Sequence, residues 1–193
     1  MPLIKYRSSL DHIMKKPVFG TTDLHNEGIP QNYSKKLLHG LCRTRRIKRI
    51  ERGKYTCLDD PIAVAAHITT PCYLSLWTAM SIRGLTDQNP FSVEVFTSRK
   101  RFRSRIDFGG TKIIFHLVKP RMMFGFENIV WKESIRIPVA RTEKIIIDGI
   151  GRLPEEEILQ MLKVCDSGLL KKYAKLSGSI KMARRIRELT GKC

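Results

Sequence analysis

Hydrophobic residues in the first third of the chain recur first at helical spacing and then in alternation. Leu37 and Leu41, with Tyr33 and Leu38 beside them, form one apolar stripe on a helix that is predicted to start at about Gln31. Polar and basic side chains occupy the other face of the same helix. Such a helix packs on a small core and presents hydrogen-bond donors suited to base edges and phosphates.

Turn and capping residues mark the neighbouring elements. Thr21 and Thr22 are N-cap residue types ahead of a short polar helix, and Gly28-Ile29-Pro30 ends that helix. Residues 47–57 then follow the pattern of strand, glycine turn and strand, with the turn at Gly53. Helix, turn, helix and basic ribbon in this order predict a winged helix-turn-helix.

Asp59-Asp60-Pro61 combines turn-forming residues and marks the predicted boundary between two domains. Residues 1–60 are predicted to be a winged helix-turn-helix DNA-binding domain, and residues 61–193 a second, regulatory domain. The predicted fold class is α+β. It consists of the N-terminal winged helix-turn-helix followed by a mixed α/β module that ends in a helical C-terminal region.

The pattern in the second domain changes from helical to alternating and back to helical. Residues 61–82 carry no formal charge and are predicted to form two buried helices broken at Thr70-Pro71. Residues 107–110 are predicted to be the turn between the first two strands. Strands are expected at about residues 92–139, namely over 92–97, 112–118 and 134–139, and helices after residue 142.

Residues 61–82 are also about as long as a membrane span, which needs roughly 20 residues. Pro61, Pro71 and several polar side chains make them a poor span, so no membrane contact is expected. The five cysteines, from Cys42 to Cys193, contain no Cys-x-x-Cys pair and predict neither a zinc site nor a secreted disulfide framework. Scattered thiols and the lack of a signal peptide lead us to expect a cytoplasmic location.

Catalytic signatures are missing from the sequence. No Asp or Glu has a lysine two positions later, as restriction-type nuclease sites do. The histidines are dispersed, and neither a Gly-x-Ser-x-Gly elbow nor a phosphate loop occurs. We therefore expect no catalytic residue, no metal and no cofactor, and we predict that the protein is not an enzyme.

Charge indicates a polyanionic partner. The chain has 36 Lys and Arg against 18 Asp and Glu, which gives a formal net charge of +18. Such a field favours nucleic acid, but the excess is spread over the whole length and does not choose DNA over RNA.

The predicted DNA contacts lie on the second helix and the ribbon. Gln31, Asn32, Ser34 and Lys35 are expected to read base edges, because amide, hydroxyl and ammonium groups suit that task. The ribbon and the turn before it are expected to hold phosphates. The complete predicted set is Thr22, Gln31, Asn32, Ser34, Lys35, Arg43, Arg45, Arg46, Lys48, Arg49, Arg52 and Lys54.

A second basic run surrounds one aromatic residue, Phe102. The run is either a solvated loop or a second polyanion contact, and the sequence leaves both interpretations open. Its charged members are Arg99, Lys100, Arg101, Arg103 and Arg105.

Three segments carry a resemblance to a known family: Gly28-Ile29-Pro30 with Arg52-Gly53-Lys54-Tyr55, residues 73–90, and residues 137–148. Through them the chain resembles the AbiEi family of antitoxin-type transcriptional regulators, over most of its length. That family belongs to type IV toxin-antitoxin systems of abortive infection, a form of antiviral defence.

The resemblance implies that a winged helix represses its own operon at inverted repeats in duplex DNA, as a dimer or as two monomers paired on the site. It also implies a C-terminal AbiEi-like antitoxin module that counteracts a nucleotidyltransferase-like toxin. Two other classes remain open. One is a nucleic-acid enzyme in which the winged helix delivers a nuclease-like second module, and the other is a basic RNA-associated structural protein.

Overall fold

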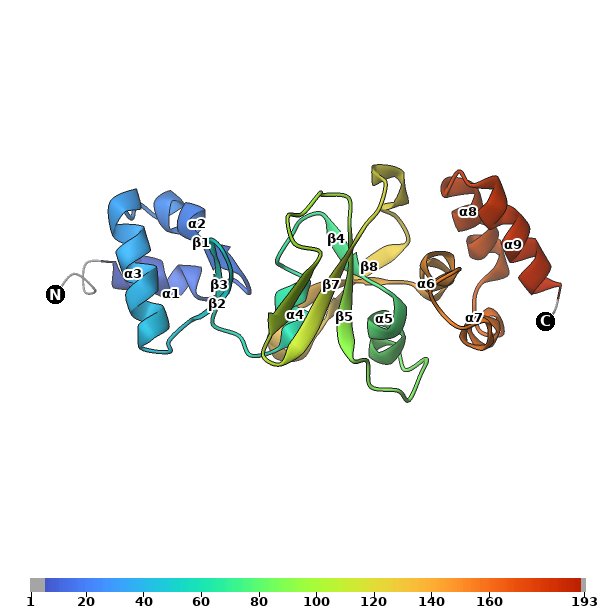
Figure 1. The fold of residues 1–193 in the computed structure, drawn as a ribbon, viewed down its shortest axis with the longest axis horizontal. Coiled ribbons are helices and arrows are strands. Elements are labelled where there is room, and N and C mark those ends of the chain that lie inside the picture. Colours follow the sequence, from blue (N-terminus) through green and yellow to red (C-terminus); the bar gives the residue numbers. More distant parts are fainter. Residues whose placement is uncertain (1–5, 192–193) are drawn as a thin grey trace.

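The computed structural model describes residues 6–191, and its fold class is α+β. Three parts follow one another along the long axis of the molecule (Figure 1). Helices with a small sheet form one end, a larger mixed sheet with neighbouring helices lies in the middle, and a group of helices forms the C-terminal end. Within the described residues, no helix is both long enough and apolar enough to cross a membrane.

The N-terminal part combines helices with a three-stranded antiparallel sheet of order β1-β3-β2. Ile13, Leu24 and Ile29 are fully buried at its centre. Gly28 ends the second helix with a positive φ of 76°, which glycine adopts without steric cost, so the chain turns sharply into the third helix. The elements are α1 (Arg7–Ile13), β1 (Phe19–Gly20), α2 (Thr21–Asn26), α3 (Gln31–Arg43), β2 (Lys48–Glu51) and β3 (Lys54–Thr56).

The start of α2 differs from the prediction. Thr21 is already helical and Gly20 is the N-cap residue, so neither Thr21 nor Thr22 caps the helix. Asp23 supplies the acceptor, because its carboxylate accepts a 2.9 Å hydrogen bond from the backbone N–H of Gly20. Thr22 lies exposed on the helix.

The central sheet has six strands in the order β6-β7-β5-β4-β9-β8. The pairs β5–β7 and β4–β9 are parallel, and the others are antiparallel. The strands are β4 (Cys72–Leu74), β5 (Ser92–Thr97), β6 (Arg105–Phe108), β7 (Thr111–Leu117), β8 (Phe126–Val130) and β9 (Arg136–Ala140).

Helices flank this sheet and continue to the C-terminal end. Helix α6 is buried almost all round, because it packs against β9 on one side and against α5, α7 and α8 on the others. The helices are α4 (Pro61–Ala65), α5 (Leu76–Ile82), η1 (Pro120–Met122), η2 (Lys132–Ser134), α6 (Thr142–Gly149), α7 (Glu155–Leu162), α8 (Ser167–Leu176) and α9 (Ile180–Thr190).

Three predictions for the central part were wrong. The stretch 61–82 holds strand β4 between two helices, and β4 shows no alternation because all three of its residues are buried. Residues 105–108 form strand β6, so the turn is confined to Gly109-Gly110. Strand β8 follows an apolar run and was not predicted. It lies at the edge of the sheet with all its side chains partly or fully exposed.

The predicted boundary segment is a helix start and not an open hinge. The Asp60 carboxylate accepts hydrogen bonds from the backbone N–H of Ile62 and Ala63 at 2.9 and 3.1 Å, and Pro61 occupies the first helical turn. Asp60 also accepts a 3.0 Å hydrogen bond from the Trp131 indole. The junction is therefore held by the second part of the chain.

Buried apolar side chains gather in two clusters, one within residues 10–47 and one within residues 64–189. Ile50 and Leu58, which precede the predicted boundary, pack against the second cluster. The ribbon thus touches both clusters, and the division into domains 1–60 and 61–193 stays a prediction.

A buried ion pair lies between α6 and the sheet. Lys144 and Asp148 are 0% and 2% exposed, and the Lys144 ammonium lies 2.6 Å from the Asp148 carboxylate. Ser75 donates to the same carboxylate at 3.0 Å, and Tyr73 lies at 3.4 Å. Burial lowers the pKa of Lys144 and raises the pKa of Asp148, because each charged form has lost its water. Each side chain needs the other to remain charged there.

Removing one partner is expected to destabilise the protein strongly. Lys144→Ala or Asp148→Ala should each lower the free energy of unfolding by about 3–5 kcal/mol, because an unpaired charge is left buried. The double variant Lys144→Ala/Asp148→Ala should lose less than the sum of the single variants, because it leaves no unpaired charge buried. Urea unfolding measures all three, and strictly additive losses would contradict this account.

Candidate nucleic-acid interface

The first turns of α3 present an exposed polar surface. Gln31, Asn32 and Lys35 are exposed, whereas Leu37 and Leu38 on the opposite face are buried in the N-terminal cluster. The helix starts directly after Pro30, as predicted. The two amide side chains therefore lie at the helix N-terminus, with rotatable ends free to meet hydrogen-bonding partners.

Ser34 does not belong to this surface, which corrects its predicted role in base reading. Its side chain is 0% exposed, and its hydroxyl donates to the backbone oxygens of Ile29 and Pro30 at 3.4 and 3.1 Å. Ser34 stands three and four residues before Leu37 and Leu38, so helical spacing alone places it on the core face. Its role is to stabilise the turn between α2 and α3.

The β2–β3 ribbon carries exposed cations. Lys48 and Arg49 are exposed on β2, and Arg52 is exposed at the turn, where Gly53 has a φ of 77°. A Cβ atom on Gly20 of β1 would lie 2.3 Å from the Gly53 carbonyl oxygen, so this turn needs a glycine beside it. Lys48 pairs with Asp59, so part of its charge is already balanced.

Helix α3 ends in an unusual way at Arg45. Arg45 has a φ of 56°, in the left-handed region that favours glycine. Its N–H and that of Arg46 donate to the carbonyls of Cys42 and Leu41, both at 3.0 Å, the pattern that Gly28 completes after α2. Arg43, Arg45 and Arg46 are all exposed. The chain thus keeps a strained arginine where a glycine would be relaxed.

Glu51 fastens the ribbon to the second part of the chain. Its carboxylate lies 2.7 Å from the Arg101 guanidinium and 3.1 Å from the Lys54 ammonium. The Arg101 side chain is only 10% exposed and stacks over the Phe115 ring at 3.9 Å from its centre. Lys54 also donates to the backbone oxygen of Ile68. Sequence reasoning missed Glu51, although it is the sole acidic residue between Cys42 and Cys57.

Arg101 differs from the other cations of the run, because its side chain is largely buried and its guanidinium pairs with Glu51. Its Nε is buried without a hydrogen-bond partner among the described residues. The other members of the run are exposed, namely Arg99, Lys100, Arg103 and Arg105.

A basic cleft of about 930 Å³ separates the ribbon from the loop that contains this run. Residues 49–52, Lys54, Thr69 and residues 99–103 line its walls, and seven of these eleven residues are Lys or Arg. Glu51 is the one acidic residue among them and is already paired twice. In the part of the chain that the structure describes, Arg52, Arg99, Lys100 and Arg103 form no ion pair. The cleft is therefore a focus of uncompensated positive charge.

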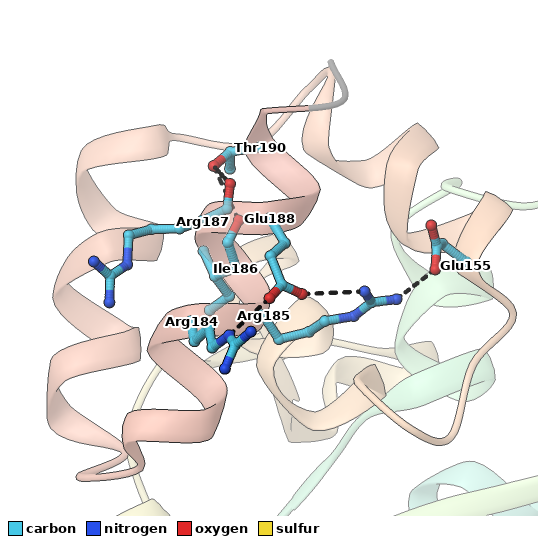
Figure 2. A network of polar contacts seen from close by, with 7 residues as sticks. All are labelled: Glu155, Arg184, Arg185, Ile186, Arg187, Glu188 and Thr190. Atoms are coloured by element: carbon cyan, nitrogen blue, oxygen red, sulfur yellow. Dashed lines mark hydrogen bonds and ion pairs between the residues drawn. The ribbon is translucent and has the colours of Figure 1, made fainter.

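The C-terminal helix α9 is also basic, but its charges are partly balanced. Figure 2 shows Arg185 between Glu188 and Glu155, with Arg184 paired to Glu188 at 3.0 Å. Arg187 points away from this network. These pairs link α9 to the start of α7 and leave less free charge here than around the cleft.

Residues 6–191 contain no cluster of three or more His, Cys, Asp or Glu side chains that could hold a metal ion. The one histidine–carboxylate contact within the central sheet joins His116 to Glu94 on the neighbouring strand, and the imidazole stacks on Phe96 at 4.7 Å. Burial raises the pKa of the Cys72 thiol to about 12. Cys193 lies outside the described residues.

No family model matches the chain, and a search of curated proteins finds no match.

Relieving the strain at Arg45 should stabilise the fold. Arg45→Gly is expected to raise the free energy of unfolding by about 0.5–1 kcal/mol, because a left-handed residue costs about 1–2 kcal/mol and glycine offsets part of that gain in the unfolded chain. Arg46→Gly, one residue further and without a positive φ, should bring no gain. Urea unfolding compares the two variants, and equal effects would argue against strain at Arg45.

Proposed function

We propose that this protein is a DNA-binding transcriptional regulator, with α2 and α3 as its helix-turn-helix and the β2–β3 ribbon as its wing. The observation that carries the proposal is the combination of an exposed amide pair at the start of α3 with the exposed cations Arg49 and Arg52 on the β2–β3 ribbon. Amides suit base edges, and cations suit the phosphate backbone.

Helix α3 has suitable dimensions for the major groove. A helix with its side chains is about 10–12 Å across, and the groove of B-DNA is about 12 Å wide. Gln31 and Asn32 would enter first and read adenine or other base edges, with Lys35 one turn further along. The buried Leu37 and Leu38 hold this face in position against the N-terminal core.

The ribbon and the C-terminal end of α3 would bind the phosphate backbone of the DNA. Five exposed arginines are available for this, namely Arg43, Arg45, Arg46, Arg49 and Arg52. Their contacts with phosphates would not depend on the base sequence. The strained Arg45 supports this assignment, because a residue kept at a conformational cost indicates a role other than stability.

The resemblance to AbiEi regulators extends the proposal. We infer that the protein represses its own operon from inverted repeats, so that two copies lie on one site, either as a dimer or paired by the DNA. We also infer that the second part of the chain counteracts a nucleotidyltransferase-like toxin encoded nearby. The resemblance carries these two inferences, which involve no catalytic step.

Variants of α3 and of the ribbon should lose different properties. Gln31→Ala and Asn32→Ala should each weaken operator binding by about 1–3 kcal/mol and leave random duplex nearly unchanged. Arg49→Ala and Arg52→Ala should weaken both duplexes alike and lower the salt slope by about 0.9 each. Fluorescence anisotropy across a salt series measures both effects.

Asn26→Ala, an exposed amide on α2, is the matched control and should leave both affinities unchanged. If the Gln31 and Asn32 variants lose as much affinity for random duplex as for the operator, the readout assignment is wrong. A salt slope near zero for the unaltered protein would exclude phosphate contacts.

Toxin counteraction should be independent of base reading. Co-expression of the full chain with a toxin encoded beside its gene should restore growth, and the Gln31→Ala/Asn32→Ala variant should restore it equally well. Plating efficiency measures the rescue. Failure of the unaltered chain would exclude the antitoxin role, and failure of the α3 variant alone would tie that role to DNA binding.

A further inference from the structure

Phe102 is the most exposed aromatic residue near the basic cleft, with 101% of its reference surface in water. It belongs to the loop that lines the cleft, between Arg101 and Arg103. Burying a phenylalanine side chain is favourable, and the free protein leaves this contribution unused. An aromatic ring held in water among cations is typical of surfaces that bind nucleobases.

The loop is anchored on both sides of Phe102. Before it, the backbone N–H of Arg99 donates to the Thr97 hydroxyl at 3.1 Å, and after it the Ser104 carbonyl accepts from the Phe115 N–H at 2.7 Å. Arg101, the residue next to Phe102, is clamped by Glu51 at 2.7 Å. The ring therefore projects from a fixed base, so that stacking on it would cost little conformational entropy.

The volume and the charge of the cleft indicate which kind of ligand it can bind. A volume of about 930 Å³ suits a small molecule or a short stretch of a polymer. A single strand can therefore enter the cleft, whereas a duplex cannot. Uncompensated cations line both walls, which suits a phosphodiester backbone. A protein partner is a poorer fit, because the cores of protein interfaces are depleted of charge, and here charge surrounds the aromatic ring.

We propose that this cleft binds a single strand of nucleic acid, with its phosphates between the ribbon and the 99–103 loop and a base stacked on Phe102. The site goes beyond duplex recognition by α3, because it needs an unpaired base and does not use Gln31 or Asn32. Stacking on an aromatic face tolerates any base, so binding should depend little on sequence.

Labelled hexamers of deoxyuridine and of uridine, which differ only in the 2′-hydroxyl, test the site in anisotropy titrations of the full chain. Phe102→Ala should weaken hexamer binding about 5- to 150-fold, since each stacked base contributes about 1–3 kcal/mol. Phe102→Trp should retain binding, and its fluorescence should be quenched by the stacked base. Phe91→Ala is the matched control, because Phe91 is equally exposed, at 99%, but lies outside the cleft.

Photo-crosslinking locates the base. A hexamer with one 5-iodouracil should crosslink to Phe102 and not to Phe91, as shown by peptide mass mapping. If one hexamer binds more tightly, its sugar identifies DNA or RNA as the ligand. Equal binding means that the site does not distinguish ribose from deoxyribose. Equal losses for Phe102→Ala and Phe91→Ala, or no binding of either hexamer, would overturn the proposal.

The result is separable from duplex recognition. Gln31→Ala/Asn32→Ala should leave hexamer affinity unchanged, and Phe102→Ala should leave the discrimination between operator and random duplex unchanged. If the Phe102 variant loses that discrimination while hexamer binding persists, the ring contacts duplex and the single-strand site is excluded.

Discussion

The ion pair between Glu51 and Arg101 determines how the two basic segments of this protein are arranged. The ribbon and the 99–103 loop are cationic segments about fifty residues apart in sequence, and their like charges repel each other. Glu51 lies 2.7 Å from Arg101, and the guanidinium is backed by the Phe115 ring. One partly buried carboxylate thus bridges two like-charged segments that line opposite sides of the cleft.

The sequence alone predicted the elements whose ends are marked by a proline or a glycine. The start of α3 at Gln31 follows from Pro30, and the ribbon turn follows from Gly53. The sequence did not predict two strands whose formation depends on contacts with residues distant along the chain. Strand β4 is buried on both faces and resembles part of a helix, and β8 is a short edge strand without a clear alternation.

The residues of the candidate site likewise include some whose exposure the sequence predicts and some whose exposure it does not. Exposure of Gln31, Asn32 and the ribbon cations follows from helical and strand periodicity. Ser34 could have been placed in the core by its spacing from Leu37, but no pattern within a run of cations reveals which arginine turns inward. Departures from local rules are informative in another way. Arg45 in a glycine conformation reduces stability, Phe102 in water contributes none, and both lie on the proposed binding surface.

The affinity of the Glu51→Ala variant for the single-stranded hexamers tests most directly whether the ribbon and the loop act as one surface. Removing an acidic residue from a polyanion-binding surface ordinarily tightens binding, because repulsion is removed. If Glu51 holds the surface together, its replacement should instead weaken binding, whereas Asp59→Ala, at an exposed carboxylate that pairs with Lys48, should not weaken it. Circular dichroism confirms that both variants are folded. Weaker binding by the Glu51 variant alone is the predicted result, and tighter binding by both variants would contradict the account.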